Sequence, residues 1–147
     1  MNIKIVQLEP KQALAIHDNC SAAELGNKFS EISAYLERNS IQIAGVPFGI
    51  YHSYSFNNVD LEAGIPVSGI QNAEGRIMVM HTYSGKAFMT AFTGPYIKLH
   101  EAWGEFARLV DPVNHKLAGP CFEAYITDRE VETDDRKWIT ELYTPIE

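Results

Sequence analysis

The octapeptide at residues 44–51, Ala-Gly-Val-Pro-Phe-Gly-Ile-Tyr, is matched by residues 118–125, Ala-Gly-Pro-Cys-Phe-Glu-Ala-Tyr. Alanine, glycine, phenylalanine and tyrosine recur at a separation of 74 residues. Similarity of a chain to itself at a fixed separation indicates a repeated structural unit. The same separation should therefore relate other features of the two halves.

An amphipathic helix is predicted ahead of each copy. Apolar residues spaced three and four apart form one stripe in each segment, and the separation of 74 maps the first stripe onto the second: Leu25, Phe29, Ile32 and Leu36, then Leu99, Trp103, Phe106 and Val110. A capping box of Ser21 and Glu24 predicts a start near Ser21 for the first helix. The second should follow Gly94-Pro95 and end near Asp111-Pro112.

Strand-like segments flank both helices and give the order β-α-β-β twice. We predict one α+β domain over residues 1–147, with repeat 1 at about 1–75 and repeat 2 at about 76–147. Two long helices should lie on an antiparallel sheet with pseudo-twofold symmetry and a ligand cleft between the repeats. Ser84-Gly85 predicts a tight hairpin turn. The expected strands are Ile3–Leu8 running on to His17, Phe48–Tyr54, Leu61–Val67, Arg76–Tyr83, Lys86–Thr93, Phe122–Thr127 and Trp138–Pro145.

The composition narrows the classes of function. Hydrophobic residues make up 46% of the 147, charged residues 21%, and the net charge is −7. That charge opposes binding to nucleic acid, so we expect no direct nucleic-acid partner. The sequence shows neither a leader-peptide pattern nor a long apolar run, so we expect neither secretion nor membrane insertion. With Cys20 and Cys121 as the only cysteines, a reducing cytoplasm is expected.

These residues resemble the gyrase-inhibitor-like (GyrI-like) effector-binding family. The resemblance lies in the pattern Ala-Gly-x-x-Phe-x-x-Tyr after each helix, in Phe122-Glu123-Ala124-Tyr125, and in the terminal Thr140-Glu141-Leu142-Tyr143-Thr144-Pro145-Ile146. Members are similar to the ligand-sensing halves of AraC-type and MerR-type multidrug regulators. The resemblance implies a cleft that takes hydrophobic, often cationic, compounds. Because strands begin at about residue 3, we expect no helix-turn-helix module and no complete transcription factor.

The resemblance also implies that Glu141 lies at the base of the drug pocket. Glu141 shares a strand face with Ile139 and Tyr143, where a carboxylate needs a reason. A carboxylate 4 Å from a cation attracts it by about 4 kcal/mol at an effective dielectric constant near 20. A micromolar ligand needs about 8 kcal/mol. Aromatic walls would have to supply the remainder through burial and cation-π contacts.

The wall candidates are mainly aromatic residues. Tyr51 and Tyr125 are related by the repeat and would face the cleft if Phe48 and Phe122 face the helices; alternatively they are half-buried strand residues. Glu123 is either a second pocket acid or an exposed residue, and Trp103 either packs in the core or borders the cleft. The candidate ligand-binding residues are Glu141, Tyr51, Tyr125, Trp103, Tyr83, Glu123, Tyr143, Trp138, Tyr96 and Phe48.

No motif predicts a cofactor or a metal. The five histidines have no metal-ligand spacing, and hydrolase elbows, dinucleotide turns and Walker loops are absent from the sequence. The leading hypothesis is a sensor or sequestering protein for hydrophobic, cationic small molecules. One alternative is a hydrolase of reactive cyclopropane-type toxins that uses Glu141 with Tyr125 as proton donor. Another is an inhibitor that binds DNA gyrase, and a homodimer or protein partner is also possible.

Overall fold

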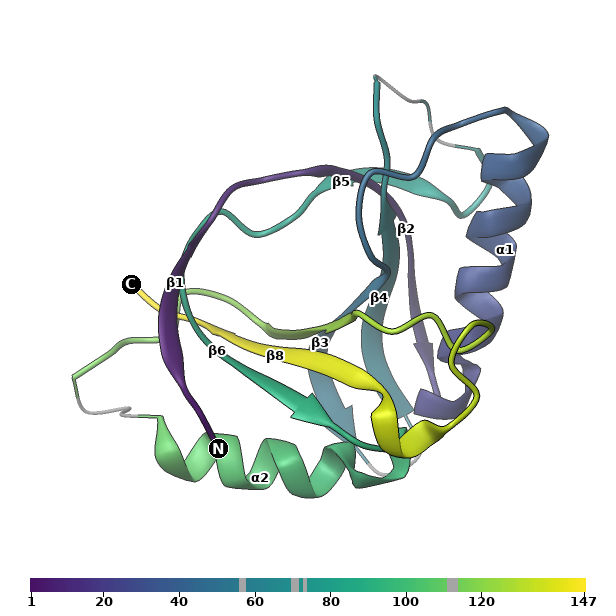
Figure 1. Cartoon of the computed structure of the whole chain (residues 1–147). Helices are drawn as coiled ribbons and strands as arrows, with labels where there is room; N and C mark the ends of the chain where they lie inside the picture. The colour runs from purple at the N-terminus through teal and green to yellow at the C-terminus, as the bar shows by residue number, and fades with distance from the viewer. Residues whose placement is uncertain (56–57, 70–71, 73, 111–113) are drawn as a thin grey trace. The chain divides into compact units, whose positions relative to one another are not determined.

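The computed structural model describes residues 1–147 except 56–57, 70–71, 73 and 111–113. The described residues form two compact units (Figure 1). The middle unit comprises Glu9–Ser84, and the terminal unit comprises Met1–Leu8 together with Gly85–Glu147. Each unit contains antiparallel strands and one long helix. The predicted α+β class is therefore confirmed.

The middle unit has the lateral strand order β3-β4-β2-β5. Its helix α1 (Leu25–Arg38) packs on β2 and β4, as Figure 1 shows. Buried residues of α1, Ile32 and Leu36, meet Leu14 and Ile65, which are paired across β2 and β4. The predicted stripe on this helix therefore does face the core. The strands are β2 (Gln12–Cys20), β3 (Phe48–Ser55), β4 (Asn58–Pro66) and β5 (Met78–His81).

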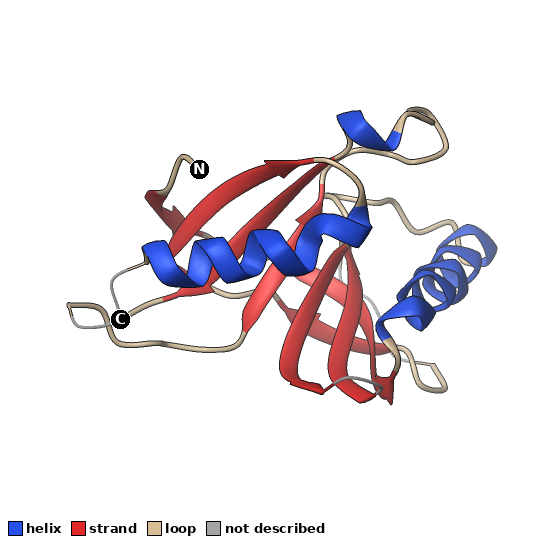
Figure 2. Cartoon of the chain, turned by 90° about the horizontal axis from the view of Figure 1, so that it is seen from below, coloured by secondary structure: helices blue, strands red, loops and turns tan. Residues whose placement is uncertain are grey.

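The terminal unit has the lateral order β1-β6-β8-β7. Its helix α2 (Leu99–Leu109) is the blue helix that runs across the strands of this unit in Figure 2. Leu99 and Phe106 of α2 pack with Phe88 and Leu142, while Trp103 borders the same cluster. The strands are β1 (Lys4–Leu8), β6 (Gly85–Thr93), β7 (Cys121–Tyr125) and β8 (Ile139–Pro145).

The order strand, helix, strand, strand occurs once in each unit, as β2-α1-β3-β4 and as β6-α2-β7-β8. The lateral order is also the same, since β3-β4-β2 corresponds to β7-β8-β6. The compact units are not continuous halves of the chain, because the terminal unit combines Met1–Leu8 with Gly85–Glu147. The repeat boundary near 75/76 stays a prediction. β1 pairs with β6 through Ile5↔Phe88, and β5 pairs with β2 through Leu14↔Val79. The first strand in sequence therefore completes the terminal unit.

Two predictions about strands were wrong. The segment from Ile3 to His17 is two strands, β1 and β2, and the break contains Pro10, which has no N–H for a ladder. The predicted hairpin at Ser84-Gly85 does not form. β5 pairs with β2, and β6 pairs with β1 and β8, so these strands have other partners.

The helix starts follow the predicted signals with small shifts. The backbone N–H of Ser21 donates to the carboxylate of Glu24 at 2.9 Å, which is one half of the capping box. A 3₁₀ turn over Ala22–Glu24 then leads into α1. In the terminal unit, Pro95 precedes a 3₁₀ turn over Tyr96–Lys98, and α2 follows. The predicted stop at Asp111-Pro112 lies outside the described residues.

Candidate ligand-binding site

The two faces of β7 carry different chemistry. Glu123 pairs with Leu142, and Tyr125 pairs with Thr140, so these side chains share the face that α2 covers. Phe122 pairs with Tyr143 and therefore lies on the opposite face. Phe122 therefore does not face the helix, so the condition under which Tyr125 would face the cleft is not met. Tyr125 and Glu123 are the residues on the helical side.

Glu123 is the centre of a buried hydrogen-bond network. Its side chain is only 3% exposed. Trp103 Nε1 of α2 donates to Glu123 Oε1 at 2.6 Å, and the Tyr125 hydroxyl donates to Oε2 at 2.6 Å. An ionised carboxylate away from water costs several kcal/mol unless hydrogen bonds compensate. The two short bonds fix the position of this carboxylate between helix and strand.

Aromatic rings continue outward from this network. The ring of Tyr96, just ahead of α2, contacts the edge of Tyr125, with centroids 5.7 Å apart and an interplanar angle of 62°. Its centroid also lies 4.8 Å from that of Trp138. The guanidinium carbon of Arg129 is 5.8 Å from the centroids of both Tyr96 and Trp138. One buried acid is thus joined to an aromatic cluster that already holds a cation.

Burial and two nearby charges act on the pKa of the Tyr96 hydroxyl in this cluster. Burial raises the pKa of the Tyr96 hydroxyl, and the Glu123 carboxylate raises it further, while Arg129 opposes both. Thr140, opposite Tyr125, is fully buried, and its hydroxyl lacks a hydrogen-bond partner among the described residues. Buried polar groups normally have partners. The helix-covered face therefore offers a carboxylate, aromatic rings and one unsatisfied hydroxyl.

Glu141, the acid singled out by the sequence, lies on the other face of the same strands. It pairs with Ala124 and Ala91, whereas Leu142 next to it faces α2. The Tyr143 hydroxyl donates to Glu141 Oε1 at 2.8 Å. Burial raises the pKa of the Tyr143 hydroxyl well above its ordinary range, and the carboxylate of Glu141 adds to this. Tyr143 also stacks on Phe122 at 4.7 Å. The structure therefore separates Glu141 and Tyr143 from Glu123.

The remaining candidates belong to the middle unit. Tyr51 packs against a cluster that contains Val59 and Leu61, on the face covered by α1. Phe48 pairs with Gly64 on the opposite face, where the ring occupies the space that a Cβ of residue 64 would need. Phe48, like Phe122, therefore does not meet the condition of facing the helix. Tyr83 is half-buried and lies in the short segment of chain that follows β5.

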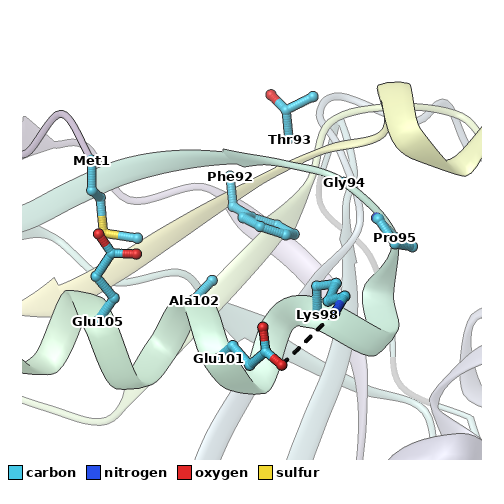
Figure 3. A pocket seen from close by; sticks show the side chains of 9 residues that line it. All are labelled: Met1, Phe92, Thr93, Gly94, Pro95, Lys98, Glu101, Ala102 and Glu105. Carbon is cyan, nitrogen blue, oxygen red and sulfur yellow. Dashed lines mark ion pairs between the residues drawn. The ribbon is translucent and has the colours of Figure 1, made fainter.

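A separate groove of about 290 Å³ lies beside α2. Figure 3 shows Phe92 between the sheet and the helix, with Lys98 and Glu101 on the helical wall, where their charged atoms are 3.9 Å apart. Gly94 is required here, because a Cβ would come within 2.9 Å of the Phe92 ring. None of the sequence-predicted site residues borders this groove. Its lining residues are Met1, Phe92, Thr93, Gly94, Pro95, Lys98, Glu101, Ala102 and Glu105.

Two histidines lie side by side in the middle unit. His17 contacts Asp60, His52 Nε2 lies 2.6 Å from Glu62 Oε1, and the two imidazole centroids are 5.1 Å apart. Within the described ranges, no group of three or more His, Cys, Asp or Glu side chains is arranged to hold a metal ion. No helix in that part of the chain is long and apolar enough to cross a membrane.

From the sequence, Glu123 was either a second pocket acid or an exposed residue, and Arg129 was not among the candidates. The signal for Glu123 was its alternation with Tyr125 two residues later, which puts both on one face. Arg129 follows β7 in an acidic loop, and no local pattern distinguishes it from a solvated charge. Trp103, Tyr125, Tyr96 and Trp138 were predicted individually. In the structure Trp103 and Tyr125 bond to Glu123, Tyr96 contacts Tyr125, and Trp138 contacts Tyr96.

Comparison with known families and structures places this arrangement in context. The model of the GyrI-like small molecule binding domain matches residues 1–147. No curated protein matches the chain significantly. The C-terminal domain of EcmrR is similar, with a TM-score of 0.84 and 18% identity over 99% of this chain and 97% of that one.

In the EcmrR–DNA complex the TM-score is 0.91 at 19% identity over 99% of this chain, which spans 57% of the EcmrR chain. SAV2435 bound to tetraphenylphosphonium has a TM-score of 0.65 and 14% identity, covering all of this chain and 94% of that one. A hydrolase from Listeria innocua has a TM-score of 0.68 and 9% identity over 99% of this chain and 91% of that one. At these identities the structures establish a shared fold.

Proposed function

The chain belongs to the GyrI-like small-molecule-binding domain family, and we propose that it binds hydrophobic cations beside the carboxylate of Glu123 as a sensor or sequestering protein. The observation that carries the proposal is the burial of Glu123, 3% exposed, between Trp103 and Tyr125. A fixed carboxylate in a medium of low dielectric attracts a cation more strongly than one in water. That SAV2435 binds tetraphenylphosphonium on the same fold supports this class of ligand.

The surrounding side chains supply the rest of the recognition. Tyr96 contacts both Tyr125, which bonds to Glu123, and Trp138. Each aromatic face in contact with a cation contributes about 0.5 to 2 kcal/mol, depending on how dry the contact is. Together with a carboxylate worth up to roughly 4 kcal/mol at 4 Å, two or three rings near the upper end of this range would reach the roughly 8 kcal/mol of a micromolar ligand. The site therefore favours ligands that combine positive charge with aromatic surface.

Glu123 and Glu141 form a matched pair for testing this proposal, because they occupy opposite faces of neighbouring strands. We would titrate tetraphenylphosphonium into the wild type, Glu123→Gln and Glu141→Gln by isothermal titration calorimetry. Tetraphenylborate has the same shape with a negative charge and serves as the ligand control. Far-ultraviolet circular dichroism confirms folding, since glutamine can still accept from Trp103.

We expect Glu123→Gln to weaken tetraphenylphosphonium binding by roughly 10- to 100-fold, because part of the charge attraction is lost. Glu141→Gln should change the dissociation constant less than about threefold, because its side chain lies on the opposite face of the strands and does not contact the proposed ligand. The reverse ranking would move the site to the face of Glu141. Absence of binding to the wild type and both variants would contradict the function itself.

A second candidate function is hydrolysis of a reactive, cyclopropane-bearing toxin. The specific observation in its favour is the 2.6 Å bond from the Tyr125 hydroxyl to Glu123 Oε2. A carboxylate beside a phenol could take a proton from water, whose oxygen bonds to one ring carbon as the C–C bond breaks. The phenol protonates the released carbon and then recovers a proton from the carboxylic acid. Glu123 replaces Glu141 as the base in this version, because Glu141 is bonded to Tyr143 on the opposite face.

Turnover distinguishes catalysis from binding. Ring-opened product, followed by mass spectrometry, should exceed the molar amount of protein if the site is catalytic, and Glu123→Gln should then abolish product while retaining some binding. Uptake of one ligand per protein without product would leave only the binding function.

A further inference from the structure

Arg129 occupies the aromatic cluster from a loop that joins β7 to β8. Its guanidinium carbon is 5.8 Å from the ring centroids of both Tyr96 and Trp138. The loop is held in place over these rings. Trp138 Nε1 donates to the carbonyl of Glu132 at 2.8 Å, and the Glu132 N–H donates to the carbonyl of Asp128 at 2.9 Å. The position of Arg129 above the rings is thus built into the loop.

Acidic residues on both sides of Arg129 do not capture its charge. Asp128 instead accepts from the backbone N–H of Glu130 at 2.9 Å. In the part of the chain that the structure describes, the Arg129 guanidinium has no hydrogen bond or salt bridge, and its contacts are with the two rings. Guanidinium groups stack favourably on tyrosine and tryptophan faces. The rings therefore already act as a binding site for a cation.

The rings under Arg129 are continuous with the proposed ligand site. Tyr96 contacts the edge of Tyr125, whose hydroxyl bonds to Glu123. We propose that Arg129 is a resident competitor, a cation of the chain itself that an incoming ligand must displace from Tyr96 and Trp138. The proposal rests on the proposed function and adds a residue that sets the affinity of the site. Because Arg129 is exposed, its side chain can leave without disturbing the core.

Displacement lowers the affinity of the site for every cation that must take the place of Arg129. When the competent state is only partly populated, the apparent affinity falls by that fraction. A small cation offers the rings no more than Arg129 does, so it gains little by replacing it. A bulky aromatic cation also buries apolar area against the same rings. We therefore infer that Arg129 imposes the same cost on every cation that displaces it, so that only large aromatic cations, which bind the rings more tightly, keep a useful affinity.

The test compares Arg129→Gln with Arg136→Gln in titrations with tetraphenylphosphonium, tetramethylammonium and tetraphenylborate. Arg136 lies in the same loop, is 84% exposed and pairs with Asp134 at 2.9 Å, so its replacement removes the same charge without touching the rings. Arg129→Lys keeps a cation at the position. The wild type provides the reference, and thermal melting confirms that each variant is folded.

Relative to Arg136→Gln, we expect Arg129→Gln to bind both cations more tightly, by roughly five- to thirtyfold for the loss of two competing ring contacts. The factor should be about the same for the two cations, because each displaces the same side chain, and Arg129→Lys should stay near the wild type. Tetraphenylborate should not gain. In wild-type spectra, the Arg129 Nε–H proton should shift when tetraphenylphosphonium saturates the protein.

The outcomes separate the two proposals. If the wild type binds tetraphenylphosphonium but Arg129→Gln behaves like Arg136→Gln, or binds more weakly, Arg129 is part of the wall and the competitor proposal is overturned while the function stands. If none of the proteins binds either cation, both proposals fail. Binding by Arg129→Gln alone would support both.

Discussion

Replacing Trp103 with phenylalanine should destabilise the protein through the carboxylate of Glu123. The variant keeps an aromatic ring next to Phe106, whose centroid lies 5.7 Å from that of Trp103, but removes the N–H that donates at 2.6 Å. Because Glu123 is 3% exposed, water cannot easily replace that donor. Hydrogen bonds to charged groups contribute about 1.5 to 3 kcal/mol. We expect the free energy of unfolding to fall by about that amount.

Trp138→Phe is the matched control in the same unit. Its indole N–H also donates to an oxygen, at 2.8 Å, but the acceptor is the neutral backbone carbonyl of Glu132. A neutral bond contributes about 0.5 to 1.5 kcal/mol. Urea unfolding followed by circular dichroism at pH 7 gives both values, and the dependence on urea should be unchanged. Equal losses for the two variants would contradict the special role of the buried carboxylate.

A double-mutant cycle with Glu123→Gln isolates the pair. If the bond from Trp103 is charge-assisted, the coupling free energy between the two substitutions should exceed about 1 kcal/mol. Additivity within about 0.5 kcal/mol, as found for independent sites, would refute the reasoning, because the bond from the indole would then owe nothing to the charge of the carboxylate.

Three further predictions concern packing and charge. Phe106→Ala, at a fully buried position, should cost about 3 to 5 kcal/mol in urea unfolding. Gly64→Ala should lower the thermal midpoint, because the new methyl group would overlap the Phe48 ring; overpacking of this kind costs about 1 to 3 kcal/mol. The hydrogen bond from Lys28 lowers the pKa of Asp18 below its ordinary 3.8. This contribution to stability is present above pH 3.8 and is lost as the pH falls through the lower pKa of the folded state. In Asp18→Asn the thermal midpoint should therefore fall less steeply with decreasing pH in this acid range.

Each of these has a control that should respond differently. Leu109→Ala removes an apolar side chain of α2 that is 54% exposed, and a loss as large as that of Phe106→Ala would contradict the core assignment. Gly119→Ala adds a methyl group only in ordinary contact with Pro145, and should be nearly neutral. If the thermal midpoint of Asp18→Asn falls as steeply with decreasing pH as that of the wild type, other carboxylates are responsible for the pH dependence.

Sequence periodicity predicted the helices well because one face of each had to be apolar. Ile32 and Leu36 of α1, and Leu99 and Phe106 of α2, are buried as expected. The pairing of the strands was harder to predict from the sequence. Met78–His81 and Gly85–Thr93 follow one another along the chain and look like a hairpin, yet each finds its partners elsewhere. Local turn residues can allow a hairpin, but the competing long-range pairings decide whether it forms.

The aromatic side of the site could be predicted in part. Alternation along β7 showed that Glu123 and Tyr125 share a face, but both faces carry apolar or aromatic residues, so alternation could not say which one α2 covers. The expected pocket acid, Glu141, was chosen by resemblance, and its role there stays a prediction. Arg129 had no sequence signal, because a cation-π contact depends on rings that are 33 and 9 residues away in the chain.

The sequence by itself determined the α+β class, the duplicated order of strand, helix, strand and strand, and the apolar stripes of both helices. These follow from local periodicity and from similarity between the halves, which need no knowledge of distant contacts. Only the tertiary structure decided which strands pair, which face of β7 is covered, and that Glu123, rather than Glu141, meets Trp103 and Tyr125. The physical reason is that a strand has two usable faces and two usable edges, and the choice between them depends on the free energy of contacts with residues far away in the chain.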